Sequence, residues 1–110
     1  EMELFALEYT ELRFLSEESK GSTPGPEASL LKIRGSEIQQ KISELTLDAV
    51  AYYGLINTNK QTPKGSNEIY AGPDYAEYLG VNYLNLRKTT IYGGSNEIQK
   101  NILSKMVLGL

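Results

Sequence analysis

The segment from Pro26 to Tyr53 constrains the fold most, because its pattern fits a single long amphipathic helix. Proline stands at its first position, where a helix tolerates it, and does not recur within the segment. Apolar or small residues recur at steps of three or four. They are Leu31, Gly35, Ile38, Ile42, Leu45, Ala49 and Tyr52. We expect this stripe to face other helices.

Two glycines bear on where this helix ends and how it packs. Gly54 follows its last periodic residue and predicts a glycine C-cap there. Gly35 lies inside the stripe, where glycine costs about 1 kcal/mol relative to alanine in an exposed helix. We therefore expect another backbone to approach closely at Gly35.

Further helices are predicted before and after this segment. Residues 1–19 show helical spacing with no Ser, Thr, Asp or Asn ahead of the pattern, so we expect a chain truncated inside a helix. Residues 73–90 predict a third helix, opened by Pro73 or Asp74 and divisible at Gly80, and a fourth helix follows the stretch 91–101. Residues 55–72 predict a long polar loop. The chain is thus predicted to be one all-α domain over residues 1–110, an antiparallel helical bundle.

Composition excludes several classes of protein. The chain of 110 residues contains neither cysteine nor histidine, which removes disulfides, thiol nucleophiles and most metal sites, so we expect no metal. A net charge of −3 with dispersed lysines and arginines gives no nucleic-acid surface. No apolar run is long enough for a membrane span, and no signal peptide is visible, so we expect a cytoplasmic location.

The stretch IYGGSNEIQKN, residues 91–101, interrupts the apolar pattern before the last helix. Ser95 or Asn96 can cap that helix, Gln99 resembles the far residue of a capping box, and Glu97 favours the helix dipole. A cap does not explain the pair Gly93-Gly94, whereas close approach of a ligand to the backbone would. Spacing alone favours the cap over a ligand site, and both remain open.

The run from Ile91 to Ile102, continued by Val107-Leu108-Gly109-Leu110, resembles the C-terminal signature of acyl-CoA dehydrogenases. Ala28-Ser29-Leu30-Leu31-Lys32 and Asp48-Ala49-Val50 are similar to the family's penultimate long helix. Family members are several times longer, with an N-terminal helical domain, a β-domain and a C-terminal four-helix bundle. The resemblance implies that this chain is part of that bundle and that FAD is the cofactor of the intact enzyme.

The family oxidises an acyl-CoA thioester to the 2,3-enoyl-CoA. A carboxylate removes the α-proton, and the β-hydrogen leaves as hydride to the flavin. The usual base position is Gly93 here, so the resemblance implies no catalytic residue in this segment and a base on an earlier helix. The resemblance also implies that Gly93 keeps the backbone N–H that bonds the thioester oxygen in the family.

The resemblance further implies substrate contacts by Tyr92, Gly93 and Gly94, and cofactor contacts by Ser95 and Glu97 with Asn96 between them. From the residues alone, Tyr92 is equally well a core aromatic. Ala51 departs from the family by replacing a glutamine near a second FAD, and Tyr53-Gly54 replaces a glycine pair.

We expect the segment alone to be inactive and to associate with itself through exposed helix faces. The intact enzyme is expected to bind acyl-CoA and an electron-transfer partner. Two alternatives stay open: a stand-alone helical interaction module, and a non-catalytic subunit of a heteromeric dehydrogenase.

Overall fold

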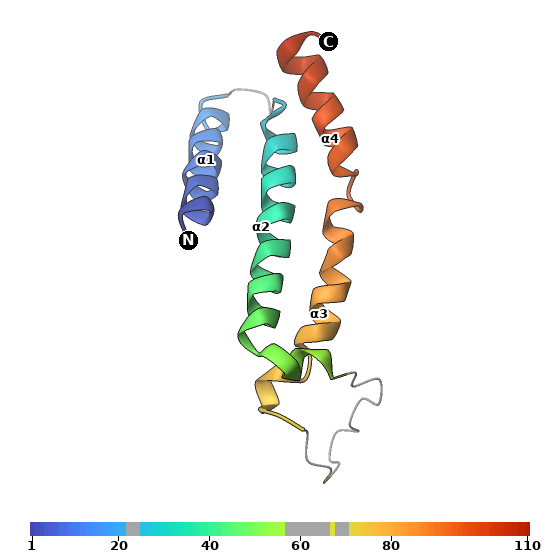
Figure 1. Ribbon diagram of the computed structural model, residues 1–110. Coiled ribbons are helices and arrows are strands. Elements are labelled where there is room, and N and C mark those ends of the chain that lie inside the picture. The colour runs from blue at the N-terminus through green and yellow to red at the C-terminus, as the bar shows by residue number, and fades with distance from the viewer. Residues whose placement is uncertain (22–24, 57–66, 68–70) are drawn as a thin grey trace. The chain divides into compact units, whose positions relative to one another are not determined.

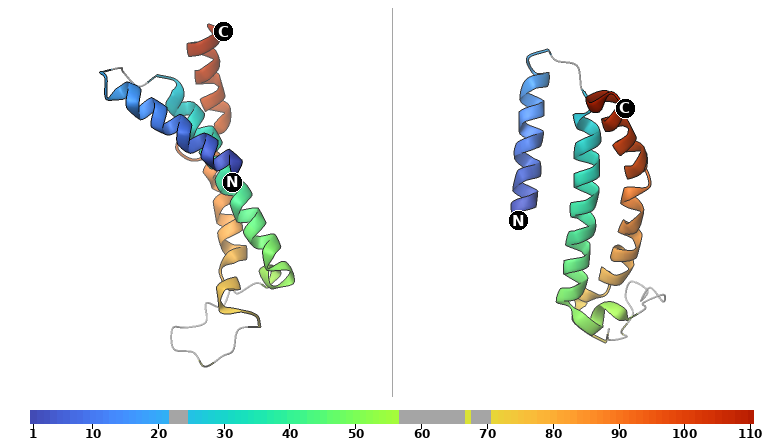
Figure 2. Two further views of the ribbon diagram at one scale, coloured as in Figure 1. Left: turned by 90° about the vertical axis from the view of Figure 1, so that its left-hand side faces the viewer. Right: turned by 45° about the horizontal axis from the view of Figure 1, so that its top comes forward.

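The computed structural model describes residues 1–21, 25–56, 67 and 71–110, and it contains helices and turns but no strand in these ranges (Figures 1 and 2). The four α-helices are α1 (Met2–Glu18), α2 (Glu27–Ala49), α3 (Leu79–Leu86) and α4 (Asn96–Leu103). Shorter helical turns are η1 (Ala51–Leu55), η2 (Asp74–Ala76), η3 (Arg87–Thr90) and the π-helical η4 (Ser104–Leu108). The prediction of an all-α chain is confirmed.

The long predicted helix ends earlier than its pattern indicates. α2 stops at Ala49, and Gly54 is a buried residue inside η1 rather than a C-cap, so that prediction was wrong. The chain turns at Ala51, whose φ of 49° is left-handed, a conformation that alanine rarely adopts. Most of the predicted loop 55–72 lies outside the described residues.

The predicted helix 73–90 consists of three pieces, η2, α3 and η3. Gly80 is the second residue of α3 and does not itself divide the segment, because the break comes before it at Glu77 and Tyr78. A methyl group on Gly80 would lie 2.5 Å from the carbonyl oxygen of Gly54. A close backbone approach was predicted at Gly35, and it occurs instead at Gly80.

The chain forms two compact units, one of residues 1–39 and 88–110 and the other of residues 40–87. In the second unit the Gln40 side chain donates to the carbonyl oxygens of Leu86 at 3.3 Å and Arg87 at 3.1 Å. Gly54 meets Gly80 in the same unit, so the later segment runs antiparallel to the earlier one. The Arg87 guanidinium donates to the Gln40 carbonyl at 3.1 Å.

The buried face of α2 is not the predicted apolar stripe. Ser29, Ser36 and Ser43, seven residues apart, are buried together with Ile33. The predicted stripe lies about 200° round the helix from them, since each residue advances about 100°. Its members Ile42, Leu45 and Tyr52 are 49%, 60% and 86% exposed. The prediction that this stripe packs on other helices was therefore wrong for these residues of the chain.

Gly35 also differs from its prediction, because a Cβ built on it has no neighbour within 4 Å. Gly35 and Gly80 are both helical, so alanine substitutions form a matched pair. We expect Gly35→Ala to raise the free energy of unfolding by up to about 1 kcal/mol through helix propensity. Gly80→Ala should lower it by roughly 1–3 kcal/mol through overpacking. Urea unfolding of the two variants measures both, and a stabilising Gly80→Ala would contradict the close contact.

Candidate functional site

The candidate site is the turn between η3 and α4. The N–H groups of Ile91 and Tyr92 both donate to the carbonyl oxygen of Lys88, at 2.9 and 3.1 Å. The next two residues, Gly93 and Gly94, have φ values of 68° and 85°, both left-handed. This conformation explains the glycine pair by itself, because side-chain-bearing residues rarely adopt it.

Ser95 ends the turn as the N-cap of α4, and its Oγ accepts a hydrogen bond from the N–H of Ile98 at 3.4 Å. Of the two predicted caps, Ser95 is the one used. The predicted capping-box role of Gln99 was wrong, because its Nε2 instead donates to the Gly93 carbonyl at 3.4 Å. In a trans peptide the N–H points opposite to the carbonyl, so Gln99 orients the Gly94 N–H away from itself.

The outward side of the turn is open. Within the described part of the chain, the N–H groups of Gly93 and Gly94 have no hydrogen-bond acceptor, and a Cβ on Gly93 would meet nothing within 4 Å. Tyr92 is 57% exposed, so in this structure it is a surface residue rather than a core aromatic. The turn thus leaves two backbone donors and an aromatic side chain available to a ligand or to another part of the protein.

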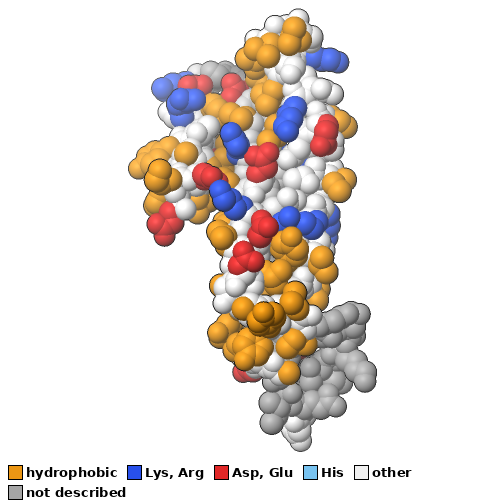
Figure 3. All heavy atoms as spheres, in the orientation of Figure 1, with side chains coloured by type: hydrophobic (Ala, Val, Ile, Leu, Met, Phe, Trp, Pro, Cys, Tyr) orange, Lys and Arg blue, Asp and Glu red, His pale blue; other side chains and the backbone are white. Residues whose placement is uncertain are grey.

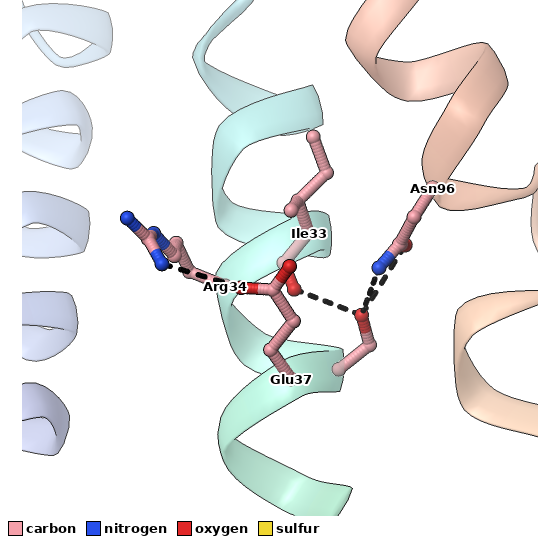
Figure 4. Close-up of polar contacts among 5 residues, drawn as sticks. Ile33, Arg34, Glu37 and Asn96 are labelled. Carbon is pink, nitrogen blue, oxygen red and sulfur yellow. Dashed lines mark hydrogen bonds and ion pairs between the residues drawn. The ribbon is translucent and has the colours of Figure 1, made fainter. Parts of the chain in front are cut away.

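Asn96 points the other way, toward α2 in the same unit (Figure 4). The residue is 5% exposed, and its Oδ1 accepts from the Lys32 Nζ at 2.7 Å. Its Nδ2 donates to the Ser36 Oγ at 3.1 Å. The Ser36 hydroxyl has a single proton and two acceptors within reach, the Ile33 carbonyl at 2.9 Å and the Asn96 Oδ1 at 3.3 Å. The shorter bond is the one to Ile33, and an oxygen lone pair is left to accept from the Asn96 Nδ2.

These contacts fix which way the Asn96 amide faces. The oxygen must meet the Lys32 ammonium and the nitrogen must meet the Ser36 lone pair, since the reverse would place two donors together. A buried polar group left without a partner costs about 1–3 kcal/mol. The network therefore holds the first residue of α4 against two neighbouring turns of α2.

Glu97 lies beside Asn96 but is exposed. Its own backbone N–H, and then the Ser95 hydroxyl, donate to the carboxylate and lower the pKa of Glu97 below its usual value. The positive charges of Lys100 and Lys32 act in the same direction. Glu97 is thus a fixed anion at the entrance to α4, where the helix dipole also favours negative charge.

The structure divides the predicted site residues into two groups. Tyr92, Gly93, Gly94 and Glu97 are exposed and Ser95 is half-buried, whereas Asn96 is buried. Neither Lys32 nor Ser36 was predicted from the sequence to belong to the site. The signal that could have found Ser36 is the spacing of the three serines at every seventh residue of α2, which indicates one helix face lined by small polar residues.

Comparison with known proteins identifies the family. A model of the acyl-CoA dehydrogenase C-terminal domain matches residues 1–108. The chain belongs to this family.

Two curated relatives are acyl-CoA dehydrogenases. The chain is 33% identical over 87 residues to acyl-CoA dehydrogenase IpdE1 of Mycobacterium tuberculosis, covering 79% of this chain and 19% of that protein. It is 68% identical over 28 residues to acyl-CoA dehydrogenase IpdE1 of Mycolicibacterium smegmatis, covering 26% of this chain and 7% of the relative. The chain therefore spans less than a fifth of either acyl-CoA dehydrogenase. No solved structure matches it.

Among the described residues, no helix has both the length and the apolar character needed to cross a bilayer. The match of the family model to residues 1–108 confirms the resemblance to acyl-CoA dehydrogenases at the level of the family and of its helical C-terminal domain.

The lowered pKa of Glu97 predicts a pH-dependent contribution to stability. A carboxylate with a depressed folded-state pKa stabilises the fold above its unfolded pKa, and this contribution is lost as the pH falls through the folded pKa. We expect Glu97→Gln to be less stable than wild type at pH 7 and the difference to shrink below pH 4.5. Urea midpoints measured from pH 7 to acid test this. Glu44→Gln, on the exposed side of α2, controls for loss of a surface charge.

Proposed function

We propose that this chain is the C-terminal portion of an FAD-dependent acyl-CoA dehydrogenase that desaturates acyl-CoA thioesters between the α and β carbons. In this proposal it contributes to thioester positioning, FAD binding and oligomerisation. The observation that carries the proposal is the turn at Gly93 and Gly94, two exposed residues whose N–H groups have no acceptor in the described part of this family member.

Thioester positioning follows from the chemistry of the α-proton. That proton is too weakly acidic for a carboxylate base unless charge on the developing enolate oxygen is stabilised. The Gly93 N–H is a fixed donor that can meet this oxygen, and the exposed ring of Tyr92 can line the acyl chain beside it. A donor held in place before reaction costs no reorganisation when the charge develops.

Position 93 carries no side chain that could remove the proton. We therefore assign the protein to a subtype in which glycine replaces the usual glutamate and the base comes from another part of the enzyme. Gly93 retains the hydrogen-bonding half of the role. Substitution at this position is further restricted by its left-handed φ of 68°.

The turn fits contacts to FAD at its edge. The Ser95 hydroxyl and the exposed Glu97 carboxylate lie at the N-terminus of α4, where they can exchange hydrogen bonds with hydroxyl groups of the cofactor. The Asn96 backbone lies between them, although its side chain is committed to Lys32 and Ser36. The chemistry supplied by bound FAD is acceptance of the hydride from the β carbon, with an electron-transfer partner reoxidising it. The chain's own residues supply placement.

A flavin measurement tests the proposed contacts. In the intact enzyme we expect Ser95→Ala and Glu97→Gln to lower flavin content and weaken FAD binding. Ser95→Thr keeps the hydroxyl and should therefore bind FAD as the wild type does. Glu44→Gln removes a charge elsewhere and should leave flavin content at the wild-type level. An intact protein without visible flavin absorbance, even at high added FAD, would refute the proposal.

The isolated segment is expected to be inactive, because no carboxylate occupies position 93. A purified sample of the 110-residue chain, supplied with FAD and an artificial electron acceptor, should not oxidise octanoyl-CoA or butyryl-CoA. Measurable acceptor reduction that depends on the acyl-CoA would show that the segment contains its own base.

Oligomerisation is supported by exposed apolar surface. Figure 3 shows hydrophobic side chains at the surface, including those at the C-terminal end of the chain at the top of the view. The apolar face of α2, with Ile42 and Leu45, is also uncovered. Exposed apolar area of this kind is typical of surfaces that pair with another subunit.

A charge on that face should prevent association. We expect Leu45→Lys in the intact protein to lower the mass measured by light scattering, because burying an unpaired ammonium is costly. Glu44→Lys introduces the same group at the neighbouring exposed position and should leave the mass unchanged. An unchanged mass for Leu45→Lys would exclude this face from the interface.

The same exposed face favours a second candidate, a helical interaction module or non-catalytic subunit derived from a dehydrogenase. Both candidates predict self-association or a partner, so mass alone does not separate them. Bound flavin or acyl-CoA oxidation by the intact protein supports the enzyme. A larger dehydrogenase subunit that co-purifies supports the non-catalytic subunit.

A further inference from the structure

Asn96 occupies an unusual place in the proposed site, because its two sequence neighbours are the proposed flavin contacts while its own side chain faces the interior. Ser95 and Glu97 are joined to it through the first turn of α4, where the backbone is fixed by helical hydrogen bonds. The position of both outward groups therefore depends on where Asn96 is held.

The groups that hold Asn96 come from α2, about sixty residues earlier in the chain. Lys32 contributes a charge-assisted hydrogen bond of 2.7 Å to Oδ1, and Ser36 accepts from Nδ2 at 3.1 Å. Ser36 is itself 8% exposed and is tied to the Ile33 carbonyl at 2.9 Å, so the support does not rest on a mobile surface side chain.

We propose that Ser36 and Lys32 are positioning residues for the flavin-contacting turn, acting through the Asn96 amide. The inference rests on the proposed function and deepens it, since it assigns to Asn96 the support of the cofactor contacts at Ser95 and Glu97. Displacement of a contacting group by about 1 Å from its productive position can cost on the order of a hundredfold in activity. A support that sets this position is therefore part of the site, although it does not touch the ligand.

The serines of α2 supply a matched control. Ser29 and Ser36 are both buried on the same helix in the same unit, two turns apart. Ser36 is bonded to Asn96 and to the Ile33 carbonyl, whereas Ser29 makes neither contact. Ser29→Ala and Ser36→Ala thus remove the same hydroxyl from equally buried positions. Only the second substitution breaks the link to α4.

The test uses the intact protein stripped of flavin and titrated with FAD, well below its unfolding temperature. We expect Ser36→Ala and Asn96→Ala each to raise the Kd for FAD by a factor on the order of ten. The double variant should lose little more than either single one, because both act through one contact. Ser36→Thr, which keeps the hydroxyl, should restore binding, and Lys32→Met should weaken it.

Amide hydrogen exchange over residues 93–98 gives a readout that does not need the cofactor. Exchange in this segment should rise in Ser36→Ala and Asn96→Ala but not in Ser29→Ala. FAD affinity equal to wild type in both variants would overturn the inference while leaving the proposed function standing. The inference would also be overturned if Ser29→Ala weakened FAD binding as much as Ser36→Ala does, because the loss would then reflect general destabilisation of the fold. A wild-type protein that does not bind FAD would overturn the proposed function, and this inference with it.

Discussion

The buried amide of Asn96 imposes the constraint on which the candidate site depends. An amide removed from water needs hydrogen-bond partners inside the protein, and in the described structure these are Lys32 for its oxygen and Ser36 for its nitrogen. Few large apolar residues are buried in the described chain, the buried hydrophobic residues being Ile33, Val50 and Ala76. Within its unit, the register of α4 on α2 is therefore set by directional hydrogen bonds as well as by packing.

Much of the helical structure could be predicted from periodicity and from turn residues. The bounds of α1 agree with the helical spacing of residues 1–19, and the start of α2 agrees with Pro26 at the first position of the predicted long helix. Periodicity predicted the wrong buried face for α2, because a pattern shows that an apolar face exists but not which neighbour covers it. The face that is buried carries Ser29, Ser36 and Ser43, which an apolar pattern does not single out.

The site was predicted less completely, and the reason differs from residue to residue. The cap at Ser95 is local chemistry and could be read from the sequence. The inward position of Asn96 depends on contacts about sixty residues away, which no local pattern contains. The two glycines suggested a ligand approaching the backbone, whereas their left-handed φ values already require glycine. Gly35 and Gly80 show the same limit, since sequence alone does not reveal which helical glycine meets another backbone.

The left-handed backbone at Gly93 also restricts how this sequence can evolve. A glutamate introduced there would have to adopt a φ of 68°, at a cost of roughly 1–2 kcal/mol for a residue with a side chain. Such a substitution would be tolerated only if neighbouring residues changed so that the turn could adopt another backbone conformation. The geometry of this turn therefore favours the retention of glycine at position 93 over any residue that has a side chain.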